Sequence, residues 1–113
     1  MHEYLLLLHE TPGDFGSLSP AQMEEVVAEY AAWAEDLARR GLLVSGRKLA
    51  DDGGRHLRAG ALASDGPYAE AKDVIGGLFI VRAGDDAQAE ALAASCPHLR
   101  GRQWIEIRRI EMV

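Results

Sequence analysis

The stretch Ser19–Gly41, "SPAQMEEVVAEYAAWAEDLARRG", is the clearest structural signal in the chain. Ser19 followed by Pro20, with Gln22 three positions after the serine, is the capping-box pattern that begins a helix. Gly41 directly after two arginines is typical of a left-handed C-terminal cap. Between these ends, apolar residues recur at spacings of three and four and give the helix one apolar face: Met23, Val26, Val27, Tyr30, Trp33, Ala34 and Leu37. The stretch therefore predicts a long amphipathic helix.

Apolar runs on both sides of this helix read as strands. "EYLLLLHE" (3–10) precedes it and "LLVSGRKLA" (42–50) follows it. Next come a small hairpin in "GGRHLRAGALAS" (53–64), with arms 56–58 and 61–63, a strand in "GLFIVRA" (77–83) and a second helix in "DDAQAEALAASCP" (85–97). "RQWIEIRRIEMV" (102–113) closes the chain as an alternating strand. This βαβ, hairpin, βαβ order predicts a ferredoxin-like α+β sandwich in one domain, residues 1–113.

Two of the predicted strands carry consecutive apolar residues. Residues 5–8 are all leucine, and residues 78–81 read Leu-Phe-Ile-Val. Because neighbouring strand residues point to opposite faces, both faces of these strands are expected to be apolar. Two helices cover only one face, and an uncovered apolar face is unusual in a monomer. A second copy packed by two-fold symmetry is the simplest cover, so we expect a homodimer joined through its sheet faces.

Composition excludes several classes of protein. Twelve Lys and Arg against eighteen Asp and Glu leave a net charge of −6, which argues against binding to the phosphate backbone of a nucleic acid. No apolar run approaches the ~20 residues that span a bilayer, and the N-terminus lacks the features of a signal peptide. A single cysteine, Cys96, excludes an internal disulfide. A reducing cytoplasm is the expected compartment.

The segment "SDGPYAEAKDVIGG" (64–77) raises the main functional question. Asp65, Gly66 and Pro67 form a turn in which Asp hydrogen-bonds nearby amides, Gly supplies a positive φ and Pro restricts the backbone. A purely structural turn is one interpretation. The other is that Asp65 presents a carboxylate to a cleft from a rigid loop.

The stretch "DGPYAEAKDVIGGLFIV" (65–81) resembles the signature of the YCII-related, DGPF-domain family, with Tyr68 where that family usually has Phe. The resemblance extends to "YLLLL" (4–8), "GLLVSGRKL" (41–49) and "CPHLRGRQWIEIRRI" (96–110). It implies a ferredoxin-like fold that forms a dimeric α/β barrel. Family members have no well-defined activity. Some occur beside extracytoplasmic-function sigma factors, and others are suspected to be enzymes that use a His-Asp pair.

His98 is the natural partner for Asp65 in such a pair. It follows Pro97 where the second helix leads to the last strand, close to the position at which the family often carries a His-Pro pair. If the two side chains meet, Asp65 could orient the imidazole for proton transfer. Gly66, Pro67, Tyr68, Glu70 and Lys72 would then form the wall of the site. The alternatives are a solvated loop histidine and a Glu70–Lys72 surface pair.

The remaining chemistry-bearing residues indicate no cofactor. The histidines lack the spacing of a metal site, and Gly76-Gly77 lacks the other glycines and the following helix of a nucleotide loop. Gly76-Gly77 instead predicts a bulge or a close backbone approach. His9 is expected to be a polar strand end that could line the barrel mouth. Cys96 is expected to be a small buried residue, because nothing local lowers its pKa.

Two hypotheses about function therefore stand side by side. In the first, the chain is an enzyme or ligand-binding protein, and Asp65 and His98 contact a small molecule in a cleft. In the second, it is a non-catalytic accessory module that binds a partner protein such as a sigma factor. An enzyme should show a pocket containing its acid/base pair, whereas a binding module should expose an apolar patch outside the dimer interface.

Overall fold

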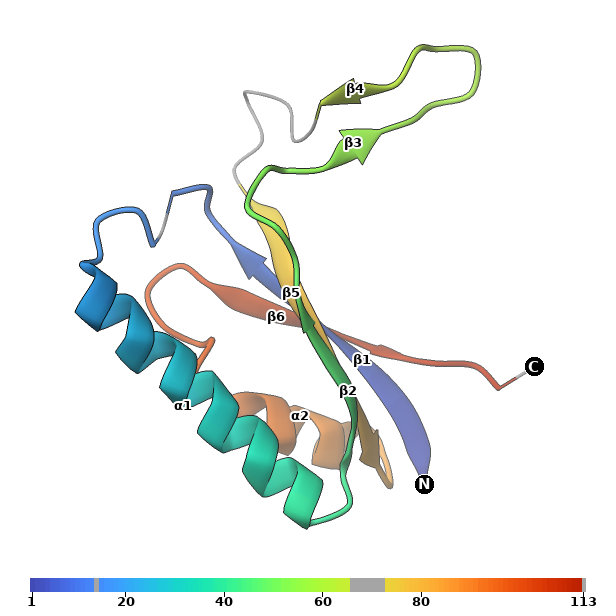
Figure 1. Cartoon of the computed structure of the whole chain (residues 1–113). Helices are drawn as coiled ribbons and strands as arrows, with labels where there is room; N and C mark the ends of the chain where they lie inside the picture. The colour runs from blue at the N-terminus through green and yellow to red at the C-terminus, as the bar shows by residue number, and fades with distance from the viewer. Residues whose placement is uncertain (14, 66–72, 113) are drawn as a thin grey trace.

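The computed structural model describes residues 1–13, 15–65 and 73–112, and shows two helices on the same side of a four-stranded antiparallel sheet (Figure 1). The strand order β2-β5-β1-β6 is that of a ferredoxin-like fold, as predicted. The elements are β1 (His2–Glu10), α1 (Pro20–Arg39), β2 (Leu43–Lys48), β3 (Arg55–His56), β4 (Ser64–Asp65), β5 (Val74–Ala83), α2 (Asp86–Ala94) and β6 (Trp104–Arg109).

Both helices begin where their capping residues predict. The Ser19 hydroxyl accepts a hydrogen bond from the Gln22 amide, and the Gln22 side chain accepts one from the Ser19 amide, so the capping box is complete. Asp85 caps α2 by accepting from the Gln88 amide. After α1, Gly41 has a φ of +72°, which favours glycine, and the chain turns there into β2.

The hydrophobic core lies between the helices and one face of the sheet. Alternate residues of β1 point into it, with Tyr4, Leu6 and Leu8 all buried. Trp33 of α1 packs edge-on against Phe79 of β5, with ring centroids 5.0 Å apart. Cys96 is buried at the end of α2 as predicted, and burial raises the pKa of its thiol.

The other residues of the central strands form an uncovered sheet face. Leu5 pairs with Ile80, and Leu7 with Leu78, so these four side chains share one face. All four are half-buried within a single chain. The two apolar sheet faces predicted from the sequence are therefore present, and neither α1 nor α2 covers this second one (Figure 1).

A β-bulge interrupts the pairing of β1 with β5. Leu8 pairs with Gly77 and His9 with Ile75, so Gly76 is the extra residue on β5. A Cβ added at Gly76 would overlap the Glu10 carboxylate. The prediction of a bulge or close approach at Gly76-Gly77 is thus confirmed.

The hairpin differs from its predicted form. Its strands β3 and β4 have only two residues each. β3 shares His56 alone with the predicted arm 56–58, and β4 lies outside the predicted arm 61–63. The turn lies where it was predicted, with Gly60 at a φ of +74° and the Ala61 amide bonded to the Arg58 carbonyl. The hairpin stands away from the four-stranded sheet (Figure 1). Its apolar residues have no sheet face to cover, and Leu57 and Leu62 are 77% and 93% exposed.

Candidate functional site

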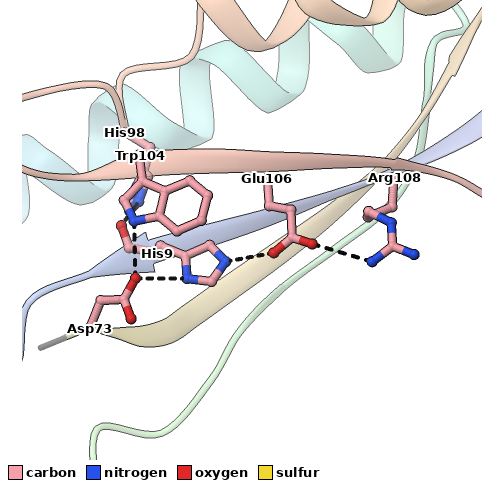
Figure 2. Close-up of polar contacts among 6 residues, drawn as sticks. All are labelled: His9, Asp73, His98, Trp104, Glu106 and Arg108. Atoms are coloured by element: carbon pink, nitrogen blue, oxygen red, sulfur yellow. Dashed lines mark hydrogen bonds and ion pairs between the residues drawn. The ribbon is translucent and has the colours of Figure 1, made fainter. Parts of the chain in front are cut away.

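His9, at the end of β1 on the uncovered sheet face, is the centre of a polar cluster (Figure 2). Its imidazole stacks on the indole of Trp104, with ring centroids 3.9 Å apart and planes 10° from parallel. Nε2 lies 3.0 Å from Glu106 Oε1 and donates to it, because an ionised carboxylate can only accept. The side chain of His9 is 12% exposed.

The second ring nitrogen of His9 lies beside Asp73. Nδ1 is 3.3 Å from Asp73 Oδ2, yet it is buried and has no partner with hydrogen-bond geometry among the described residues. We therefore treat this approach as an electrostatic contact and not as a hydrogen bond. Two carboxylates thus flank one imidazole, one on each nitrogen.

The two oxygens of Asp73 have different surroundings. Oδ2 accepts a hydrogen bond from Trp104 Nε1 at 3.0 Å and also faces His9. Oδ1 has no hydrogen-bonding partner within the described residues, and the side chain is 44% exposed. Asp73 therefore has one oxygen that Trp104 holds and one that no described residue holds.

Glu106 continues the cluster along β6. The hydrogen bond from His9, assisted by Arg108 at 3.3 Å, lowers the pKa of the Glu106 carboxyl below its ordinary value. A lowered pKa keeps this carboxylate ionised at neutral pH, so it accepts the hydrogen bond that fixes the orientation of the His9 ring.

A cleft of about 1060 Å³ opens at this end of the sheet. His9 and Asp73 both line it, together with the loop after β1, the start of α1 and the segment between β2 and β3. The apolar part of the lining comes from Phe15, Met23, Leu49, Val74 and Ile75. This volume lies just above the range of about 300–1,000 Å³ that is usual for small-molecule sites.

His98 lies behind this cluster and is 2% exposed. Its Nε2 donates to the backbone carbonyl of His9 at 2.8 Å. Its Nδ1 accepts from the Tyr30 hydroxyl at 2.8 Å and lies 3.0 Å from the Gln103 amide nitrogen. Burial raises the pKa of Tyr30 to about 12, so its hydroxyl keeps the proton that it donates. His98 is therefore part of a buried hydrogen-bond network and not a solvated loop residue.

Of the predicted site residues, the structure describes His98 but not the side chains of the loop at 65–72. Gly66, Pro67, Tyr68, Glu70 and Lys72 lie outside the described residues, as does the side chain of Asp65, whose backbone pairs with Arg55. The Asp65–His98 pair accordingly stays a prediction. The described partners of His98 are His9, Tyr30 and Gln103.

Sequence reasoning missed the cluster around His9. The sequence predicts His9 to be a polar strand end that could line the barrel mouth, and it does not single out Asp73, Trp104 or Glu106 as site residues. Alternation in "QWIEIRR" (103–109) does place Trp104 and Glu106 on one face of a strand. Their meeting with His9 also requires the β1–β6 register, in which His9 pairs with Trp104. No local pattern encodes that register.

The YCII-related domain family matches residues 2–112, almost the whole chain. The chain belongs to the YCII-related family. A search of curated proteins found no match. The resemblance noted from the sequence is thereby confirmed at the level of the family.

Among the described residues, no group of three or more His, Cys, Asp or Glu side chains is arranged to hold a metal ion. Within the same part of the chain, no helix has the length and apolar character needed to cross a membrane.

Proposed function

We propose that this YCII-related chain binds a small organic molecule in the cleft and that Asp73 transfers a proton to or from it. The observation that carries this proposal is the asymmetry of the Asp73 carboxylate. Trp104 holds Oδ2, whereas Oδ1 has no hydrogen-bonding partner among the described residues, and Asp73 lines the cleft. A carboxylate fixed by one oxygen and accessible through the other is suited to general acid–base chemistry.

His9 supports Asp73 in this role. When Asp73 accepts a proton from a C–H bond of the ligand, the bond's electron pair stays on the ligand and the carboxylate loses its charge. The loss of charge on Asp73 changes its electrostatic interaction with the imidazole beside Oδ2. Glu106, on the other nitrogen of the ring, keeps the ring oriented. His98 acts one step further away, because its hydrogen bond to the His9 carbonyl fixes the backbone that carries the imidazole.

The test is a thermal-shift screen against a metabolite library with the wild type and Asp73→Asn. The substitution keeps the shape of the side chain and removes its charge and basicity. Compounds that stabilise the wild type are then incubated with each protein in D₂O, and deuterium entry at carbon is followed by NMR. We expect exchange in the wild type that is lost in Asp73→Asn.

Asp36→Asn is the matched control, because Asp36 is an exposed acid on α1 that pairs with Arg39 and Arg40 and does not line the cleft. It should leave both binding and exchange unchanged. Hits that stabilise wild type and Asp73→Asn equally would contradict the proposed site. Binding lost in Asp73→Asn without deuterium entry would reduce the proposal to a binding site without proton transfer.

We further propose that the uncovered sheet face joins two copies in a homodimer. Leu5, Leu7, Leu78 and Ile80 form its apolar centre, and Glu106 and Arg108 lie beside them through pairing with Leu7 and Leu5. Light scattering at micromolar concentration should give twice the mass of one chain. Leu7→Lys should shift that mass toward the monomer. A stable wild-type monomer would contradict this assembly.

The hairpin favours a second candidate function, the accessory module that binds a partner protein. Leu57 and Leu62 are largely exposed on a segment that stands away from the sheet, and such apolar residues outside the proposed dimer face suit protein contact. Under this hypothesis the metabolite screen would give no hits. Capture of a sigma factor by the wild type but not by the double variant Leu57→Ser/Leu62→Ser would support it.

A further inference from the structure

We infer that the two copies of the proposed homodimer are related by a two-fold axis parallel to the strands, so that Arg47 of the partner subunit pairs with Glu106 in the cluster around His9. The inference rests on that homodimer, since it names how the second copy is oriented on the uncovered sheet face. Each subunit then contributes one charged side chain to the polar cluster of the other.

Paired residues of the four-stranded sheet form rows of side chains that cross the uncovered face. β2 and β6 lie at the two edges of this sheet, with β5 and β1 between them (Figure 1). Residues that pair directly share a face. From β2 to β6, one row reads Arg47, Leu78, Leu7 and Glu106. A basic side chain thus stands at one edge of an apolar row and an acidic side chain at the other.

Arg47 points away from the core. A Cβ added to its neighbour Gly46 would lie 2.7 Å from the ring of Phe79, which packs against the core, so Gly46 faces the helices. Successive strand residues point to opposite faces, which places Arg47 on the uncovered side. Arg47 is exposed, and its guanidinium donates to the Gly46 carbonyl at 2.7 Å. It has no acidic partner among the described residues.

Glu106 is able to accept a further hydrogen bond. Within the chain, Oε1 accepts from His9 Nε2 at 3.0 Å and Oε2 accepts from Arg108 at 3.3 Å (Figure 2). A carboxylate offers about four lone-pair sites on its two oxygens, and the Glu106 side chain is 31% exposed. A second guanidinium can therefore approach it from the uncovered side without displacing either partner.

A two-fold axis parallel to the strands brings the two opposite edges together. With the axis through the apolar centre of the face, β2 of one subunit lies over β6 of the other, and each row lies over its own copy. Two-fold symmetry makes the contact occur twice, so each Arg47 meets Glu106 of the partner subunit. Packed sheets lie about 10 Å apart, and the long side chains of arginine and glutamate reach across such a gap from both sides.

A two-fold axis across the strands is the alternative. It lays β2 over β2 and exchanges the row of Arg47 with the adjacent row, which begins at Ser45 and ends at Arg108. Arg47 would then lie opposite Ser45 of the partner subunit, without an acidic partner. The axis parallel to the strands instead leaves Arg108 with its own Glu106 and gives Arg47 a carboxylate as well. Complementary charges of this kind fix the register of an interface.

The experiment exchanges the charges at the two edges. Arg47→Glu or Glu106→Arg alone should raise the dissociation constant of the homodimer at least about tenfold in analytical ultracentrifugation, because like charges then face each other twice. Mixing the two variants should restore assembly, since the mixed dimer contains one reversed pair and one native pair. Native mass spectrometry of an equal mixture should show mixed dimers well above the half-share that random association gives.

Arg39→Glu is the matched control, because Arg39 is an exposed arginine at the end of α1 and makes the same change of charge away from the sheet. It should leave the homodimer unaltered, and its mixture with Glu106→Arg should give no excess of mixed dimers. At concentrations where both proteins are dimeric, carboxyl NMR should also give Glu106 a higher pKa in Arg47→Glu than in Arg39→Glu.

The possible outcomes separate this orientation from the homodimer itself. A homodimer that Leu7→Lys dissociates but Arg47→Glu leaves intact would overturn the orientation and retain the assembly. Mixed dimers at only their random share would overturn the orientation too. A monomeric wild type would contradict the homodimer, and the orientation with it. None of these results affects the metabolite hits that depend on Asp73.

Discussion

His9 and His98 lie on opposite sides of the same strand end, and their surroundings differ in kind. Both nitrogens of His98 have hydrogen-bonding partners in a buried network. His9 has one hydrogen-bonded nitrogen and one that faces a carboxylate without a hydrogen bond. A fully satisfied buried histidine contributes to stability, whereas an incompletely satisfied one beside a cleft is available for function. The burial of His98, more than its sequence position, identifies it as the structural member of the two.

The comparison predicts the largest loss of stability for His98→Leu. This substitution leaves the Tyr30 hydroxyl, the Gln103 amide and the His9 carbonyl without their buried partner. We expect about 3 kcal/mol of lost unfolding free energy, measured by urea denaturation. A loss no greater than that of His9→Gln would break the distinction between the two histidines.

Tyr30→Phe tests the same network through one hydrogen bond, and should cost about 1 kcal/mol. The raised pKa of Tyr30 also predicts a pH dependence. Because the folded-state pKa of about 12 exceeds the ordinary value of 10.0, the contribution of Tyr30 is complete below pH 10.0 and is lost as pH rises toward 12. Wild-type stability should fall across this range, and the fall should be smaller in Tyr30→Phe. Parallel curves for the two proteins would contradict the prediction.

His9→Gln should affect stability less, by about 0.5–1 kcal/mol, because the cluster is partly exposed. The clearer effect of His9→Gln is expected on the pKa of the Glu106 carboxyl, because the hydrogen bond from His9 is the largest cause of its lowering. Carboxyl NMR should show that pKa moving up toward its ordinary value. Since a lowered folded-state pKa stabilises only above the unfolded value, the wild type should lose this contribution as pH falls below about 4.3. An unchanged Glu106 pKa would show that the His9–Glu106 bond does not form in solution.

Trp104→Phe is expected to have the smallest effect on stability, about 0.5 kcal/mol, because the indole is 44% exposed and an aromatic ring still stacks on His9. It removes the Nε1 donor that holds Asp73 Oδ2. The Asp73-dependent entry of deuterium into a bound ligand should therefore become slower in Trp104→Phe, while the midpoint temperature of thermal unfolding barely changes. Equal effects on both measurements would indicate that Trp104 serves packing alone.

The sequence was sufficient for the fold because its signals are local. The capping box at Ser19, the turn at Gly41 and the leucine run of β1 each determine their own segment. The site depends on contacts between segments far apart in the chain. His9 meets Glu106 across 97 positions, and His98 meets His9 across 89. Such contacts follow from strand register and helix placement, which residue spacing does not reveal.

The bulge at Gly76 determines which charged side chain of the β5 segment lies beside His9. The extra residue changes the phase of β5, so that Ile75 shares a face with His9 and Asp73, two positions earlier, reaches the same imidazole. If the bulge closed and Gly76 itself paired with His9, that segment would turn by one position and Asp73 would move to the side of the helices, with every side chain intact. In this family fold, a one-residue shift of register can therefore exchange the chemistry beside His9 more completely than a substitution can.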